Sequence, residues 1–480
     1  MKKLRNYIGG EFSNSENHNW ISSFNPASGL EICKIEKSDF QDVDNAVKAA
    51  KDAFDEWSSK TFKERADWLI KIAKGLESRI DEIANLESMD TGKPITIAKE
   101  VDAKRSILNF EFFAEIISDI ETQEFEMRDA TNIVIQKPVG VGALITPWNL
   151  PLYLLSWKVA PAIGMGNTVV CKPSELTPMT ADLLMRVIDD VNLPPGVVNL
   201  IHGDGEVAGS GLVSHDGIDL VSFTGGTLTG EKVATSSAKS FKKMSLELGG
   251  KNSSIVFSDC DLERTLDDVV RAGFLNQGQI CLCGSRVLIE DSIYENFKKR
   301  LVEKVDGLKM GDPFDESTEI GSLISKEHRD KVSSYVDLAI EEGGEILTGL
   351  QSGKPIGFEG GNWMNPVIIE GLSVNSRCST EEIFGPIVTI HSFSTEQEVI
   401  SIANNTDYGL AGSIWTADIE KAQRVAKSIN SGMIWINTWL HRDLRVPFGG
   451  VKKSGMGREG GRWSLDFFSE TMNICIKDTK

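Results

Sequence analysis

Apolar residues recur along the chain at two spacings that alternate from one end to the other. Residues 41–57 place them three to four positions apart, which predicts an amphipathic helix, and residues 62–86 predict a longer one. Short runs rich in β-branched residues lie between helical segments, at 168–171, 218–223 and 253–257. Each such run predicts a buried strand followed by a turn and a helix, a succession typical of a parallel sheet. The predicted fold class is α/β.

Three other segments depart from this alternation. Residues 131–136 and 472–477 predict strands of a small separate sheet or of a sheet between subunits. Residues 139–164 are apolar enough to suggest a membrane span, but three prolines and Lys158 interrupt them. A buried strand, a loop and a helix in succession explain that segment better. No membrane partner is predicted.

Length and charge narrow the function. A chain of 480 residues exceeds one ordinary core and suits two or three domains. Its net charge of −19, from 70 acidic and 51 basic residues, would repel nucleic acid and anionic membranes, so a small-molecule partner is expected. The seven scattered cysteines form no regular disulfide framework, and the N-terminus lacks the apolar stretch of a signal peptide. A cytoplasmic location is therefore expected.

Two segments have the character of a dinucleotide site. Residues 223–230, Phe-Thr-Gly-Gly-Thr-Leu-Thr-Gly, follow a strand and open a helix, so free backbone N–H groups can face a pyrophosphate. Their GxxxxG spacing also suits a plain glycine turn. Lys172 and Glu175 follow another strand, where a carboxylate can accept bonds from ribose hydroxyls and repel a 2′-phosphate. The alternative is a solvated loop.

Cys281 and Glu247 are candidate reactive groups. Cys281 follows Gln-Gly-Gln, a loop that can supply the donors a nucleophilic thiolate needs; a buried thiol with no reactivity is the alternative. Cys281 and Cys283 resemble half of a metal site, but no second cysteine pair or histidine cluster completes it, so no metal is predicted. Glu247 lies among apolar residues and becomes a general base if burial raises its pKa; otherwise it is an ordinary surface carboxylate.

Seven segments, in this order along the chain, resemble motifs of the aldehyde dehydrogenase superfamily. They are Thr-Pro-Trp-Asn at 146–149, Lys-Pro-Ser-Glu at 172–175, Phe-Thr-Gly-Gly-Thr at 223–227, Glu-Leu-Gly-Gly at 247–250, Asn-Gln-Gly-Gln-Ile-Cys at 276–281, Glu-Ile-Phe-Gly-Pro at 382–386 and Pro-Phe-Gly-Gly at 447–450. The resemblance covers essentially the whole chain. It favours the reactive interpretation of each segment over the alternatives above.

The resemblance implies a catalytic role for five residues. Cys281 would attack the aldehyde carbonyl, and the Asn149 side chain would help a backbone N–H to hold the oxyanion. After hydride transfer, Glu247 would activate the water that hydrolyses the thioester, which favours a free acid over a coenzyme A thioester. Lys158 and Glu459 match positions that relay the proton outward.

The implied cofactor is NAD. The positions that match its contacts are Ile145, Thr146, Pro147, Trp148, Lys172, Glu175, Gly205, Phe223, Gly225, Gly226, Thr229, Leu248, Glu382 and Phe384. Gly226 and Leu228 depart from the family pattern, which has Ser and Glu there, and this puts the hold on the pyrophosphate in doubt. The departure bears on NAD affinity more than on NAD identity.

Substrate choice is suggested by two arginines. The segments at 102–110 and 437–445 resemble the branch that oxidises 2-amino- or 2-hydroxymuconic semialdehyde and the related retinal-oxidising enzymes. In that branch, arginines matching Arg105 and Arg442 bind the distant carboxylate of the substrate, and Phe448 also matches a substrate position. Arg445 is an alternative to Arg442, and structural ion pairs are the alternative for both. Rival functions are a broad aliphatic or betaine-type aldehyde dehydrogenase, a coenzyme A-acylating dehydrogenase and a non-catalytic binding protein.

The resemblance also implies the architecture. A Rossmann-like NAD-binding domain would comprise residues 1–116 and 139–249, and an α/β catalytic domain residues 250–449. Residues 117–138 and 464–480 would form a small β arm for oligomerisation. Its unpaired edge would extend the sheet of another subunit, so a homodimer or homotetramer is expected.

Overall fold

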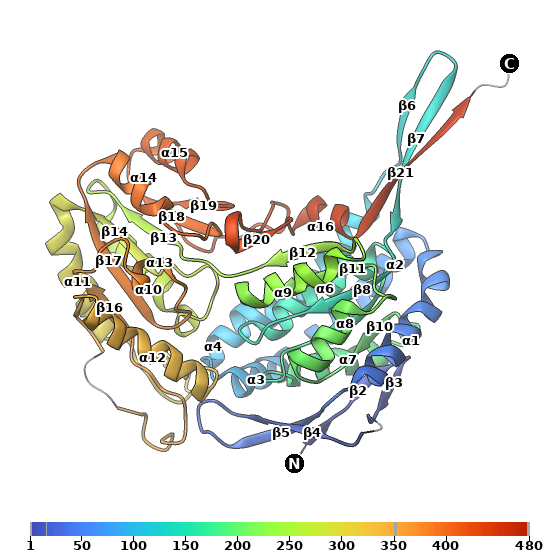
Figure 1. The fold of residues 1–480 in the computed structure, drawn as a ribbon, viewed down its shortest axis with the longest axis horizontal. Helices are drawn as coiled ribbons and strands as arrows, with labels where there is room; N and C mark the ends of the chain where they lie inside the picture. The colour runs from blue at the N-terminus through green and yellow to red at the C-terminus, as the bar shows by residue number, and fades with distance from the viewer. Residues whose placement is uncertain (1, 16, 350–352, 478–480) are drawn as a thin grey trace.

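The computed structural model describes residues 2–15, 17–349 and 353–477. Two bodies, each built on one large sheet, lie side by side, and a narrow arm projects from one of them (Figure 1). Parallel strands followed by helices make up both bodies, as the alternating spacing predicts. The α/β fold class is confirmed.

The first body has an eight-stranded sheet in the order β20-β12-β11-β8-β9-β10-β2-β3. Its parallel centre consists of β8 (Val141–Ile145), β9 (Thr168–Lys172), β10 (Val198–Leu200), β11 (Leu220–Thr224) and β12 (Lys243–Glu247). Antiparallel strands close both edges, namely β20 (Gly455–Met456) on one side and β2 (Asn6–Ile8) with β3 (Glu11–Ser13) on the other. These short edge strands were not predicted. Residues beyond 449 therefore return to the sheet of the predicted NAD-binding domain.

Helices cover both faces of this sheet with separate apolar cores. One face is covered by α1 (Phe40–Ser58), α8 (Ser210–Ser214) and α9 (Thr227–Ala238). The other is covered by α2 (Phe62–Glu77), α3 (Ile80–Thr91), α5 (Lys104–Ser118), α6 (Pro151–Gly164) and α7 (Met179–Asp190). The single helix predicted over residues 62–86 is wrong. The chain caps α2 at Ser78 and starts α3 two residues later, so each helix buries its own apolar stripe.

Residues 139–164 form β8, a loop and α6, the succession predicted for them. Within the described residues, no helix is long and apolar enough to cross a membrane. Two short helices join α3 to α5: α4 (Ile95–Ile97) and the π-helix η1 (Ala98–Ala103).

The second body has a seven-stranded sheet in the order β15-β16-β17-β14-β13-β18-β19. Its strands are β13 (Ser253–Val256), β14 (Arg286–Glu290), β15 (Glu345–Ile346), β16 (Val367–Glu370), β17 (Ile387–Phe393), β18 (Ala411–Trp415) and β19 (Met433–Ile436). All pair in parallel except β15. The helices packed around it are α10 (Leu262–Phe274), α11 (Tyr294–Asp306), α12 (Lys326–Glu341), α13 (Arg377–Thr380), α14 (Glu396–Asn404) and α15 (Ile419–Ser428).

Two smaller sheets complete the fold. An N-terminal sheet joins β1 (Lys2–Leu4), β5 (Glu31–Glu36) and β4 (Trp20–Phe24). The projecting arm joins β21 (Ser469–Lys477), β7 (Ala130–Pro138) and β6 (Gln123–Glu126), all antiparallel (Figure 1). The predicted arm segments begin earlier than these strands, within α5 and α16 (Gly461–Phe467), and residues 478–480 lie outside the described part.

Candidate active site

A cavity of about 460 Å³ lies between the two bodies and is large enough for a small ligand. Residues from both bodies line it, together with α5 and the loop that follows β8. The predicted site residues that it brings together are Arg105, Pro147, Trp148, Asn149, Gly225, Gly226, Leu248, Cys281, Glu382, Phe384, Arg442 and Phe448. The other predicted site residues lie outside its lining.

Cys281 follows a backbone turn of unusual conformation. Asn276, Gln277 and Gly278 have φ values of 52°, 57° and 70°, a left-handed run that is costly for the two non-glycine residues and is typical of functional sites. The carbonyl of Cys281 accepts a hydrogen bond from Asn252 Nδ2 at 2.7 Å. Burial raises the pKa of the Cys281 thiol, and the nearby carboxyl groups of Glu247 and Glu382 act in the same direction. The thiol is thus protonated in this state and needs a base to become a nucleophile.

Asn149 lines the cavity with Cys281 from the loop between β8 and α6. Its Nδ2 donates to the carbonyl of Gln279 at 3.0 Å, which ties it to the loop that carries the thiol. Its own carbonyl accepts hydrogen bonds from Lys93 Nζ at 3.0 Å and Asn276 Nδ2 at 3.3 Å. Hydrogen bonds therefore hold Asn149 at its side chain and at its backbone, and its amide donor lines the same cavity as the thiol.

Glu247 ends β12 and is only 4% exposed. Neither of its carboxylate oxygens has a hydrogen-bond partner among the described residues. Burial raises its pKa well above the ordinary value; Glu459 raises it further and Lys158 opposes this. Gly449, at φ 144°, allows the close approach, since a Cβ there would lie 2.7 Å from Glu247 Oε1. A buried carboxyl group without partners is suited to proton transfer.

Lys158 and Glu459 form a buried ion pair with an Nζ–Oε1 distance of 2.8 Å. The Lys158 ammonium also donates to Ser222 Oγ at 2.8 Å. Both charges act on the Glu247 carboxyl group, so the three residues form one electrostatic unit behind the cavity.

The carboxyl ends of β8, β9 and β11 lie side by side and carry several predicted cofactor contacts. Ile145 pairs with Lys172 on one neighbouring strand and with Phe223 on the other. Lys172 Nζ lies 3.6 Å from Glu175 Oε2, and burial lowers the Lys172 pKa. Thr146 Oγ1 is buried with no partner among the described residues, an unfilled hydrogen-bonding position at this edge. Gly205 begins the π-helix η2 (Gly205–Gly209) near the same edge, and space there is open.

The predicted phosphate turn lies at the start of α9. Gly226 is its N-cap residue and no side chain caps it, so N–H groups of the first turn are free for an anion. Leu228 is 78% exposed, and the first turn of α9 contains no acidic residue. Thr229 N–H turns back to the Gly226 carbonyl at 3.1 Å, and Leu248 packs against Gly230.

Glu382 and Phe384 line the cavity on the second body. Glu382 Oε1 accepts a bond from Gly250 N–H at 2.8 Å, and any Cβ at Gly249 would collide with the Glu382 carboxylate. Burial raises the Glu382 pKa. Phe384 has a φ of 63°, and its ring packs edge-on against Trp148 at 5.4 Å.

Arg105 and Arg442 line the cavity with guanidinium groups that have no carboxylate partner among the described residues. Arg105 Nε and Nη2 are buried without hydrogen-bond partners, and the guanidinium lies 5.4 Å from the Tyr153 ring. Burial lowers the Arg105 pKa, and Arg442 acts in the same direction. The Arg442 guanidinium packs 4.1 Å from the Phe448 ring. Arg445 instead pairs with Asp443, is exposed and does not line the cavity.

The chain is similar over nearly its whole length to proteins of known activity. The family model described as "Aldehyde dehydrogenase family" matches residues 12–474. The chain belongs to this family. A 2-aminomuconic semialdehyde dehydrogenase of Danio rerio is 46% identical, with 99% of this chain and 98% of the relative covered. A 2-hydroxymuconic semialdehyde dehydrogenase of Pseudomonas sp. (strain CF600) is 42% identical over 99% of this chain and 100% of the relative.

A solved structure shares this fold over nearly the whole chain. The betaine aldehyde dehydrogenase of Staphylococcus aureus, in complex with NAD⁺, has a TM-score of 0.97 and 37% identity over 99% of this chain and 95% of that chain. The aldehyde dehydrogenase fold predicted from the motifs is confirmed. The chain is therefore an oxidoreductase that acts on aldehydes.

Several residues that shape the site carry no motif signal in the sequence. His328 Nε2–H donates to the Phe384 carbonyl at 2.7 Å, and its ring packs edge-on against those of Trp148 and Phe384. Burial lowers the His328 pKa to about 4, so the ring is neutral near pH 7. Lys93 is fully buried below Asn149. An isolated histidine or lysine in the sequence does not reveal a role in the site. The role becomes visible only when the fold shows which groups the residue contacts.

Proposed function

We propose that this aldehyde dehydrogenase uses NAD to oxidise a semialdehyde that bears a carboxylate, such as 2-amino- or 2-hydroxymuconic semialdehyde. The observation that carries the proposal is the pair Arg105 and Arg442, two cationic side chains that line the cavity of Cys281 and form no ion pair with a carboxylate of the described residues. A planar guanidinium with free donors is suited to a ligand carboxylate. The names of the relatives from Danio rerio and Pseudomonas support the same class.

The reaction begins at Cys281. Its thiolate attacks the aldehyde carbon, and Asn149 Nδ2 donates to the oxygen as negative charge develops there. The chemistry that NAD supplies when bound is acceptance of a hydride. The substrate then remains on Cys281 as a thioester. Water in the cavity accepts the thiol proton before this attack, and the positive charge of Arg442 favours the thiolate.

Glu247 then takes a proton from the water that hydrolyses the thioester, and the acid product leaves. Its raised pKa makes it a stronger base than an exposed carboxylate. The Lys158–Glu459 pair provides a route for the proton away from Glu247. This use of water favours a free acid over a coenzyme A thioester.

The residues present fit a dinucleotide. The uncapped start of α9, the unpartnered Thr146 Oγ1 and the Lys172–Glu175 pair lie on the first body, as expected for pyrophosphate and adenosine ribose. Glu175 is partly exposed and would repel a 2′-phosphate, which favours NAD over NADP. The first body is accordingly proposed as the NAD-binding domain and the second as the catalytic domain.

A betaine-type substrate is disfavoured by the same arginines, because a cationic aldehyde would meet two positive charges in the cavity. The arm is proposed to join two or more copies of the chain. Seven free cysteines favour a reducing compartment such as the cytoplasm.

The test is NADH formation, followed by absorbance, across matched neutral, cationic and carboxylate-bearing aldehydes with NAD or NADP. We expect kcat/KM to be highest for a carboxylate-bearing semialdehyde with NAD, and coenzyme A to leave the product unchanged. A preference for cationic aldehydes, or a product that requires coenzyme A, would overturn the proposal.

A further inference from the structure

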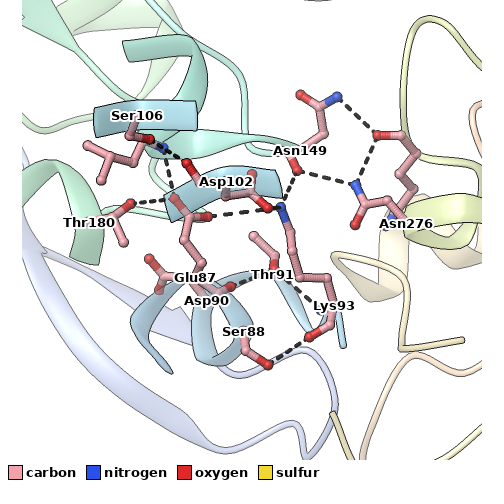
Figure 2. Close-up of polar contacts among 12 residues, drawn as sticks. Glu87, Ser88, Asp90, Thr91, Lys93, Asp102, Ser106, Asn149, Thr180 and Asn276 are labelled. Carbon is pink, nitrogen blue, oxygen red and sulfur yellow. Dashed lines mark hydrogen bonds and ion pairs between the residues drawn. The ribbon is translucent and has the colours of Figure 1, made fainter. Parts of the chain in front are cut away.

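A buried cluster of charges lies directly behind the catalytic loop. Lys93, just after α3, has a fully buried ammonium that lies 2.9 Å from Asp102 Oδ2 and 4.0 Å from Glu87 Oε2 (Figure 2). All three side chains are 0% exposed. Removing charges from water is costly, and apolar packing stabilises a core as well or better. The cluster therefore calls for a role other than stability.

The cluster forms hydrogen bonds with the loop between β8 and α6 at Asn149 and with the start of α6 at Leu152. Lys93 Nζ donates to the Asn149 carbonyl at 3.0 Å, and Asn276 Nδ2 donates to the same carbonyl at 3.3 Å (Figure 2). Glu87 Oε1 accepts from Leu152 N–H at 2.9 Å, in the first turn of α6. Residues 149–152 are thus fixed from below, while the Asn149 side chain lines the cavity above.

Asp102 holds Lys93 from a π-helix. It lies in η1, three positions before Arg105, and π-helical turns are rare and frequent at functional sites. Burial raises the Asp102 pKa, and Lys93 opposes this. The wide turn thus presents a carboxylate to Lys93 on one side and leads into the cavity-lining Arg105 on the other.

We propose that Lys93 is a positioning residue: held by Asp102 and Glu87, it fixes the Asn149 carbonyl and thereby aims Asn149 Nδ2 at the oxyanion. The inference rests on the proposed oxyanion role of Asn149. A backbone carbonyl held by an ammonium fixes the peptide plane next to the Asn149 side chain, and the hydrogen bond from Asn149 Nδ2 to the Gln279 carbonyl limits the rotation of that side chain. Small losses of alignment at a reacting centre cost large factors in rate.

A double-mutant cycle tests the proposal in the full-length enzyme. Lys93→Met with Asp102→Asn removes both charges at similar volume, and Asn149→Ala removes the amide. With a carboxylate-bearing semialdehyde, we expect the Lys93 and Asp102 change to lower the single-turnover rate of NADH formation about 10- to 100-fold with NAD affinity retained. In the Asn149→Ala background, the same change should cost less than about twofold, since the group it aims is gone.

Equal losses in both backgrounds would overturn the inference, because a merely structural effect multiplies with the loss of Asn149. A thermal melt identifies variants that fail to fold. If the double change does not fold, the same cycle is measured with Asp102→Asn alone, which retains the Lys93 ammonium. Its smaller loss should also vanish without Asn149, and its persistence would count against the proposal. Lys99→Met removes a lysine of η1 that pairs with Asp81 at the surface and should leave the rate unchanged.

An intact single-turnover rate in Asn149→Ala, or a parent enzyme that oxidises no aldehyde, would overturn the proposed mechanism itself. Turnover by the parent with losses that multiply would overturn only the role of Lys93. The two failures are therefore distinguishable.

Discussion

The ammonium of Lys158 lies 2.8 Å from Glu459 Oε1, and these two buried charges shift the pKa of the Glu247 carboxyl group in opposite directions. Burial is the main cause of the raised Glu247 pKa; Glu459 adds to it and Lys158 reduces it. The acid side of the kcat pH profile should follow this pKa, because Glu247 must be ionised to accept a proton from water. Burial thus mainly sets the lower end of the working pH range, and the Lys158–Glu459 pair adjusts it.

Two substitutions should move that profile in opposite directions. Glu459→Gln removes a negative charge, so the Glu247 pKa falls and the acid limb of kcat moves to lower pH. Lys158→Met removes a positive charge, so the pKa rises and the limb moves to higher pH. Steady-state kcat measured across pH values checks both, with a thermal melt for each variant. Shifts in the same direction would contradict this arrangement.

Cys281→Ala should abolish NADH formation while NAD binding, measured by calorimetry, stays within about twofold, because the thiol and not the cavity is lost. Cys283→Ala is the matched control, two residues along the same loop and buried away from the cavity lining. We expect it to retain turnover. Full activity of Cys281→Ala, or loss of activity only in Cys283→Ala, would exclude Cys281 as the nucleophile.

Glu247→Gln should separate the two halves of the reaction. The amide keeps the shape of the side chain but cannot accept the proton of the attacking water, so hydrolysis should slow by about 10²- to 10⁴-fold. The thioester on Cys281 then accumulates and is detected as an added mass on the intact protein. If the variant shows neither a burst of NADH nor an added mass, Glu247 acts before acylation instead.

Parts of the fold follow from local patterns. The strand, turn and helix at 220–238 could be predicted because the alternation, the glycines and the helix start lie within one short segment. The break between α2 and α3 could not, since neither glycine nor proline marks Ser78. β20 has two residues, and its pairing with β12 depends on contacts far apart in the chain.

Some residues of the candidate site could likewise be predicted from the sequence, and others could not. Cys281 and Glu247 could be found because they lie in ordered motifs. Lys93 and Asp102 could not, because an isolated lysine and aspartate acquire meaning only when the fold buries them together. Arg442 and Arg445 were alternatives in sequence, and only tertiary structure separates the one that lines the cavity.

Arg105→Met should lower kcat/KM for a carboxylate-bearing semialdehyde by about 10- to 100-fold, as expected from a charged hydrogen bond of about 1.5–3 kcal/mol. A neutral aldehyde should be oxidised at nearly the parent rate, because it makes no use of the guanidinium. Arg445→Met is the matched control, since its guanidinium pairs with Asp443 at the surface. Equal losses with neutral and carboxylate-bearing aldehydes would show that Arg105 supports the cavity wall and not the carboxylate.

The arm leaves apolar side chains of β21 in solvent: Met472 is 44% exposed, Ile474 37% and Ile476 53%. These three alternate along the strand and share one face, and an exposed apolar face on an edge strand favours association with another chain. If the arm joins copies of the chain, Ile474→Lys with Ile476→Lys should reduce the mass measured by light scattering toward one subunit. Asn473→Lys with Cys475→Lys places the same two charges on the opposite face and should reduce the mass less. A parent chain that is already monomeric, or an isoleucine double variant that keeps the parent mass, would show that this face does not hold the assembly together.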